Sequence, residues 1–146
     1  MTAVHIAIGV GLIAVNALAG LWGGWRWHRR EPSRTFWILL RAGQALVLIE
    51  ALDGAILVLQ GRDLPRLHLV YGLVPIGVSF VAEQLRLLSA QTVLDRLGLE
   101  SAREVGTLSE PQQRALVRDI VCREMGIMAV SAGVVALLGI RAAGGL

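Results

Sequence analysis

Four apolar stretches, each long enough to cross a lipid bilayer, constrain the fold of this chain more than any other feature. They lie at residues 3–25, 36–59, 67–87 and 121–141, and a membrane-spanning helix needs about 20 apolar residues. Of the 146 residues, 55% are hydrophobic, and a soluble domain of this length has too small an interior to bury so much apolar surface. We therefore expect an all-α, polytopic membrane protein that forms a single domain over residues 1–146.

The distribution of arginine predicts how the four spans are oriented. Every basic residue other than histidine is Arg, and the net charge is +3. Because arginine-rich loops remain in the cytoplasm, both termini are expected outside the cell (inner) membrane, with the first and third connections in the cytoplasm. This topology accounts for the basic composition without a nucleic-acid partner, so the expected partner is the lipid bilayer. The first connection carries Arg26, Arg29, Arg30 and Arg34, and the third connection with its flanks carries Arg86, Arg96, Arg103, Arg114, Arg118 and Arg123.

The N-terminal apolar stretch also resembles a signal peptide, because "NALAG" offers an Ala-x-Ala cleavage site. Positive charge, however, follows this stretch instead of preceding it, which favours an uncleaved first span. Four tryptophans flank the first connection, as an interfacial aromatic belt would. They are Trp22, Trp25, Trp27 and Trp37.

The third connection, residues 88–120, is predicted to be a helical hairpin that extends spans three and four into the cytoplasm. Gly98 can end the first helix, and Ser109 can cap the second, with Gln112 as the reciprocal capping partner. At roughly 1.5 Å per residue the hairpin reaches about 15 Å beyond the membrane. We interpret it as a self-packed stalk, with a docking surface as the alternative. Its apolar seam is Leu94, Leu97, Leu116, Val117 and Ile120.

The third span is polar along one face. At about 100° per residue, a helix places its small and polar residues within a sector of about 60°. Such a face must point into the protein, because an ionisable group at membrane depth needs a partner or water. These residues are His68, Gly72, Pro75, Ser79, Glu83 and Arg86.

The other spans indicate a four-helix bundle with a polar interior. On the second span, Arg41 and Gln44 lie roughly opposite Glu50 and Asp53, so this helix should have protein on two sides. The first and fourth spans carry stripes that include small residues, and on the first span Gly20-xxx-Gly24 and Ala19-xxx-Gly23 permit close helix approach. These stripes comprise His5, Gly9, Leu12, Asn16, Ala19, Gly20, Gly23 and Trp27 on the first span, and Gly126, Ala129, Gly133 and Ala136 on the fourth.

Counting residues from the cytoplasmic end of each span sorts the polar groups into two layers. His5, Asp53 and His68 fall within about 3 Å of one level near the outer surface, with Glu50 and Tyr71 one turn deeper. The inner layer is predicted to lock the bundle through paired charges, Arg41 with Glu83 and Arg123 with Glu124; an anion or lipid-headgroup pocket is the alternative. Its members are Arg41, Gln44, Glu83, Arg86, Arg123 and Glu124.

The outer layer allows several interpretations. His5 and His68 could be the two axial ligands of a b-type haem, with Tyr71 and Asn16 beside it. With Asp53 or Glu50 added, the two histidines could instead bind a metal ion, or the groups could relay protons. The simplest interpretation is hydrogen bonding between helices. Only two histidines lie in spans, since His28 lies among the arginines of the first connection, so a four-histidine, two-haem arrangement is excluded.

Motifs of soluble enzymes are absent from the sequence: GxSxG, HExxH, GxxxxGK[ST] and paired cysteines do not occur. Cys122 is the only cysteine, which excludes an internal disulfide. We expect a non-catalytic accessory or structural membrane component, acting as a homodimer or in a larger membrane complex. The alternatives are a haem- or metal-binding protein that transfers electrons or protons, and a small dimeric transporter.

Overall fold

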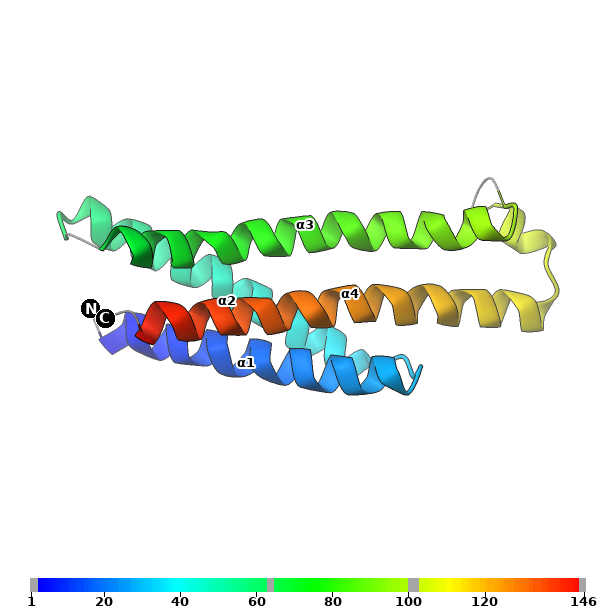
Figure 1. Cartoon of the computed structure of the whole chain (residues 1–146), viewed down its shortest axis with the longest axis horizontal. Coiled ribbons are helices and arrows are strands. Elements are labelled where there is room, and N and C mark those ends of the chain that lie inside the picture. The colour runs from blue at the N-terminus through cyan, green and yellow to red at the C-terminus, as the bar shows by residue number, and fades with distance from the viewer. Residues whose placement is uncertain (1–2, 63–64, 100–102, 145–146) are drawn as a thin grey trace.

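The computed structural model describes residues 3–62, 65–99 and 103–144, and this part of the chain is helical apart from short connections (Figure 1). Four of its helices are long and apolar enough to cross a membrane. They extend beyond the predicted spans at one or both ends. In chain order the helices are α1 (Ala3–His28), α2 (Arg34–Leu59), α3 (Arg66–Arg96), the short 3-10 helix η1 (Glu104–Thr107) and α4 (Glu110–Gly144).

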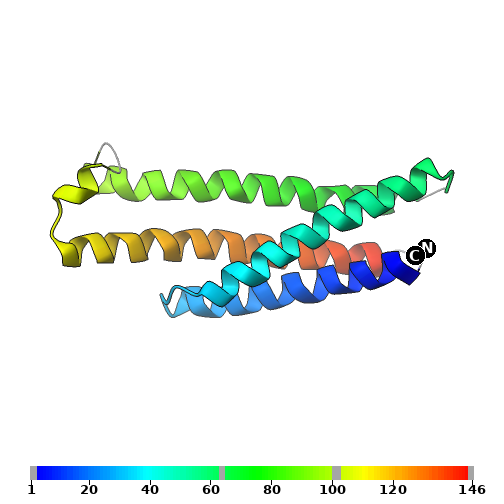
Figure 2. The ribbon, with the colours of Figure 1, turned by 180° about the vertical axis from the view of Figure 1, so that it is seen from behind.

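Helix α4 lies at the centre of the arrangement. It packs against α1 on one side and α3 on the other, so that these three helices run side by side (Figure 1). Helix α2 packs mainly on α1 and crosses the other helices diagonally, behind them in Figure 1 and in front of them in the reverse view (Figure 2). Both chain ends lie at one end of the molecule, while α3 and α4 project beyond the α1–α2 turn at the other.

In the α3–α4 hairpin, α3 ends and α4 begins where the sequence predicts. Gly98 has φ +68°, and the N–H of Leu99 donates to the carbonyl of Leu94 at 3.1 Å, the bond that closes a Schellman cap. At the start of α4, the backbone N–H of Ser109 donates to Gln112 Oε1 at 3.0 Å, as in a capping box. The sequence did not predict η1, because a single 3-10 turn leaves no hydrophobic period.

Helix α1 also ends in a Schellman cap, but Arg30 takes the place usually held by glycine. Its φ is +54°, and the N–H groups of Arg30 and Glu31 donate to the carbonyls of Trp27 and Arg26 at 2.9 and 3.0 Å. Left-handed backbone costs a residue with a Cβ roughly 1 kcal/mol. Arginine is therefore an unfavourable choice for the backbone at this position.

Small residues bring α1 close to its neighbours, as their pattern predicts. A Cβ on Gly20 would lie 3.0 Å from the backbone nitrogen of Gly133 on α4. A Cβ on Gly23 would lie 2.4 Å from the ring of Phe36, which is fully buried. A Cβ on Gly24, by contrast, would meet no neighbouring atom within 4 Å, so the Gly20-xxx-Gly24 pattern makes close contact through its first glycine only.

The polar face of α3 is turned toward the protein, as its periodicity predicts. Pro75 and Ala82 are buried, and the side chain of Glu83 is only 25% exposed. On the opposite side of the helix, Val70 and Leu88 are 52% and 63% exposed. Gly72, which the periodicity placed on the same face, is exposed. The angular grouping of polar residues therefore identified the inward face of this helix for its other members.

Candidate functional site: two polar clusters

A first polar cluster, the histidine cluster, consists of His5, Glu50, Asp53 and His68. His5 is 5% exposed, its Nδ1 lies 2.9 Å from Asp53 Oδ2, and its Nε2 lies 3.3 Å from Glu50 Oε1. Both carboxylates belong to α2, whereas the imidazole belongs to α1. An imidazole that carries both protons would donate to both acids at once, so His5 joins the two helices by its two ring nitrogens.

His68 adds the third helix to this cluster. Its ring lies 5.8 Å from the ring of His5, centroid to centroid, with 55° between the planes. Two atoms in the cluster, His68 Nδ1 and Glu50 Oε2, are buried without a hydrogen-bond partner in the described part of the chain. Gly9 leaves room for the acid, because a Cβ there would lie 3.1 Å from Glu50 Oε1. Each of these two atoms can therefore form a further hydrogen bond.

Tyr71 and Asn16, which the haem interpretation placed beside the histidines, make contacts with other residues. The guanidinium of Arg141 lies over the ring of Tyr71, 5.8 Å from its centroid. Asn16 donates from its amide to the carbonyl of Leu12 at 2.9 Å. It packs against Gly43 of α2, where a Cβ would lie 2.8 Å from Asn16 Oδ1. Asn16 therefore contributes to α1–α2 packing in the middle of the helices.

A second polar cluster, the arginine cluster, joins α2, α3 and α4 around Glu83. Arg41 of α2 contacts Glu83 Oε1 directly, as the sequence predicts, and Gln44 Nε2 donates to the same oxygen at 3.1 Å. Arg86 lies 3.1 Å from Glu83 Oε2 through Nε and 3.8 Å from Glu124 Oε2 through a terminal nitrogen. The cluster thus has two arginines opposite two glutamates, with Gln44 between them. Its members are Arg41, Gln44, Glu83, Arg86 and Glu124.

The predicted pair of Arg123 and Glu124 is not formed. Neighbouring residues on a helix point in directions about 100° apart and do not face one another. Glu124 faces Arg86 instead, while Arg123 points away from the cluster and lines a groove between α3 and α4. Sequence reasoning also missed Trp37, assigned to the aromatic belt, whose ring lies 5.7 Å from the guanidinium carbon of Arg86.

An apolar layer separates the two clusters. It consists of Leu12, Val47 and Val135, which are 5%, 3% and 1% exposed. On α2, Val47 lies about one helical turn from Gln44 of the arginine cluster and about one turn from Glu50 of the histidine cluster. The two clusters are therefore separate sites, as the sequence predicts from their depths.

The geometry of His5 fits hydrogen bonding better than ligation. An axial haem ligand needs one ring nitrogen directed at the iron, but both nitrogens of His5 face carboxylates. Within the described residues, no group of three or more His, Cys, Asp or Glu side chains is placed to hold a metal ion. The predicted ligands His5, His68, Asp53 and Glu50 come together, but as an acid–imidazole network.

Comparisons with known proteins add no function to this geometry. No family model, curated protein or solved structure matches the chain. The functional argument therefore rests on the clusters, the apolar layer between them and the surfaces of the four helices.

Proposed function

We propose that the chain is an integral protein of the cell (inner) membrane, with four spans and both termini outside, that serves as a non-catalytic accessory or structural component. The membrane topology is supported by four long apolar helices and by arginines gathered at one end of them. The described chain ends, Ala3 and Gly144, lie at the end away from the α1–α2 turn. Trp22, Trp25 and Trp27 surround the arginine-rich end of α1, as interfacial anchors do.

The single cysteine makes this topology easy to test. In a Cys122→Ala background, Gln60→Cys places a thiol between α2 and α3, and Pro32→Cys places one in the α1–α2 turn; both positions are exposed. A membrane-impermeant maleimide should label Gln60→Cys in intact cells and Pro32→Cys only after permeabilisation. The reverse pattern would contradict the proposed orientation.

The observation that carries the structural role is the pairing of charges between helices. Glu83 and Glu124 face arginines, and Glu50 and Asp53 face His5. Ionisable groups at membrane depth are tolerated against such partners, and here the pairs connect α1 to α2, α2 to α3, and α3 to α4. The apolar layer fills the space between the clusters, which weighs against a transport pathway along the helices. In this proposal the polar groups hold the helices together.

A second candidate function, proton or electron transfer at the histidine cluster, is favoured by one observation. Glu50 Oε2 and His68 Nδ1 are buried without hydrogen-bond partners in the described chain, and such atoms cost free energy unless they are used. Proton transfer needs no rearrangement of His5, whereas haem ligation by Nε2 requires it to leave Glu50. The proton version is therefore the better supported of the two.

Purification in detergent followed by a visible spectrum and a metal analysis separates these functions. A colourless, metal-free protein is expected from the structural role. A Soret band that disappears in both His5→Ala and His68→Ala would overturn the structural role and establish a haem site. In proteoliposomes with an internal pH dye and an imposed potential, we expect no proton flux above that of protein-free vesicles. A flux abolished by Glu50→Gln would support the second candidate instead.

A further inference from the structure

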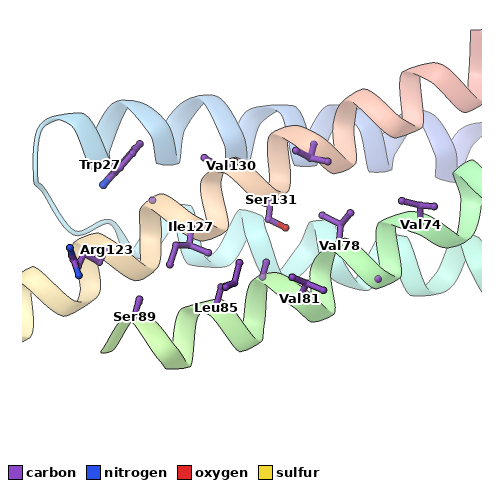
Figure 3. Close-up of a pocket in the computed structure, with 14 residues that line it drawn as sticks. Trp27, Val74, Val78, Val81, Leu85, Ser89, Arg123, Ile127, Val130 and Ser131 are labelled. Carbon is purple, nitrogen blue, oxygen red and sulfur yellow. The ribbon is translucent and has the colours of Figure 1, made fainter. Parts of the chain in front are cut away.

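A groove of about 880 Å³ runs between α3 and α4, on the side of the molecule away from α2 (Figure 3). Figure 3 shows Val74 and Val78 toward one end, Leu85 and Ile127 along it, and Arg123 with Ser89 at the other end. Its lining is aliphatic side chains and glycines, apart from Ser131 midway along it and Trp27, Ser89 and Arg123 toward the polar end. The groove combines an apolar length with a cationic end.

A second hollow, the basic pocket, continues from the cationic end of this groove. Trp27 and Arg123 line both hollows. The basic pocket measures about 920 Å³. Three arginines and one acid line it, Arg30, Arg96, Arg123 and Asp119, and His28 lies beside them. Because positive charge exceeds negative charge, the basic pocket favours an anion.

The backbone of Arg30 provides independent support for a ligand in the basic pocket. This residue holds the left-handed cap position at φ +54°, where glycine has no steric penalty. Backbone strain kept at one residue points to a role for its side chain. The side chain of Arg30 lines the basic pocket, so the charge is placed there against the preference of the backbone.

We propose that the groove and the basic pocket together bind one anionic phospholipid, with an acyl chain between α3 and α4 and the phosphate at Arg123 and Arg30. The aliphatic side of the groove from Val74 to Leu85 is about 16 Å long at 1.5 Å per residue. This length matches one leaflet, about half of the roughly 30 Å hydrocarbon core. Arg123 forms no ion pair in residues 3–62, 65–99 and 103–144, so its guanidinium is available to the phosphate. The lipid belongs to the cytoplasmic leaflet only if the proposed topology holds.

The test uses the full chain in dodecyl maltoside, so that lipid binding is measured independently of membrane orientation. Native mass spectrometry and thermal unfolding are recorded with added dioleoylphosphatidylglycerol, dioleoylphosphatidylcholine or inorganic phosphate. We expect one tightly bound phosphatidylglycerol per chain and a raised Tm. Phosphatidylcholine and inorganic phosphate should each bind more weakly, because the first lacks net negative charge and the second lacks the chain.

Two substitutions test the headgroup contacts. Arg123→Gln and Arg30→Gly should each weaken phosphatidylglycerol binding about fivefold, the loss expected for one arginine near an anionic lipid. Arg30→Gly is the sharper variant, because glycine suits the left-handed cap and the Tm without lipid should not fall. Loss of lipid preference in a protein of unchanged or greater stability separates a binding role from a structural one.

One substitution tests the acyl groove. Gly77 lines the groove, and a Cβ there meets no atom within 4 Å, so Gly77→Leu should place a side chain in the groove and displace the lipid. Gly72→Leu is the matched control, since Gly72 is equally open but does not line the groove. It should leave binding unchanged.

Four outcomes would overturn the proposal. Phosphatidylcholine could bind as tightly as phosphatidylglycerol, or inorganic phosphate could bind as tightly as the lipid. Arg30→Gly and Arg123→Gln could leave the lipid preference unchanged. Finally, a dimer that Gly77→Leu dissociates would show that a second copy of the chain, and not a lipid, occupies the groove.

Discussion

Both polar clusters neutralise acidic side chains that lie between apolar helices, but they do so with different chemistry. The arginine cluster neutralises Glu83 and Glu124 with Arg41 and Arg86, and guanidinium groups remain charged at every physiological pH. The histidine cluster opposes Glu50 and Asp53 with the single imidazole of His5, and an imidazole, unlike a guanidinium, exists in neutral and charged forms. A fixed balance of charge suits a structural joint, whereas a balance that depends on protons suits a site that can respond to its surroundings.

The clusters also differ in how completely their atoms are paired. Both oxygens of Glu83 face cations or amides. Arg86 Nε makes no hydrogen bond among the described residues, but it lies in an ion pair 3.1 Å from Glu83 Oε2. In the histidine cluster, Glu50 Oε2 and His68 Nδ1 have no hydrogen-bond partner among those residues. We infer that the arginine cluster contributes more to stability and that the histidine cluster retains capacity for a proton or a ligand. The following substitutions test this difference.

Removing Glu83 should give the largest loss of stability. Glu83→Ala leaves Arg41 and Arg86 without their shared acid, and we expect a loss of about 2 kcal/mol, below the range for a fully buried pair because Arg41 is half exposed. Arg41→Ala should partly restore the Glu83→Ala protein. The measurement is unfolding in mixed micelles for the two single variants and the double variant.

Glu110→Ala is the control for Glu83→Ala. Glu110 pairs with Arg114 on the surface of α4, where both side chains are at least 80% exposed, so its loss should cost less than about 0.5 kcal/mol. If Glu83→Ala and Arg41→Ala lowered stability additively, the pair would not be coupled, and the structural role of the arginine cluster would be refuted.

Removing His5 should have a smaller effect. His5→Ala deprives Glu50 and Asp53 of their donor, and we expect a loss of about 1 to 2 kcal/mol. Adding Glu50→Gln and Asp53→Asn should recover part of this loss, since uncharged amides no longer need a cation. Unfolding in the same micelles measures both the loss and its recovery. An unchanged stability in His5→Ala would show that this cluster does not hold α1 to α2.

Arg123 should contribute little to stability, although it is next to a member of the arginine cluster. Arg123→Ala should change the free energy of unfolding by less than about 0.5 kcal/mol in detergent without anionic lipid, the usual range for a site away from paired charges. Arg86→Ala is the comparison, because Arg86 contacts both glutamates and should cost more. Equal losses would mean that Arg123 belongs to the cluster in solution.

The smallest expected effect is coupling between the clusters. Because the apolar layer separates them, the losses in His5→Ala and Glu83→Ala should add within about 0.5 kcal/mol in the double variant. Chemical unfolding of all four proteins gives the coupling energy. A larger value would show that the two clusters act as one network through α2.

Much of this organisation could be predicted from the sequence, because lipid and regular helices impose strong rules. The period of α3 identified its inward face, and residue counting brought His5, Asp53 and His68 to one level. The pairing of Arg41 with Glu83 could be predicted because the two residues lie at the same depth and carry opposite charges. Asn16 shows the limit, since its stripe predicted an inward position but not that its amide would bond to its own helix.

Other features depended on information that periodicity does not carry. The partner of Glu124 required knowing how α3 is rotated against α4, and the α3–α4 groove required the diagonal course of α2, which leaves that face uncovered. The left-handed backbone of Arg30 gave no signal, because arginine is uncommon in that conformation. These features arise from tertiary packing and not from local pattern.

The central position of α4 has a consequence for biosynthesis. This helix packs on both α1 and α3, yet it is the last of the four to leave the ribosome. In the proposed topology the spans insert one after another and associate afterwards, so α1 and α3 would wait in the bilayer without the helix on which both pack. A chain interrupted before Glu110 would keep the α1–α2 contact, but Gly20 of α1 would have lost its neighbour on α4.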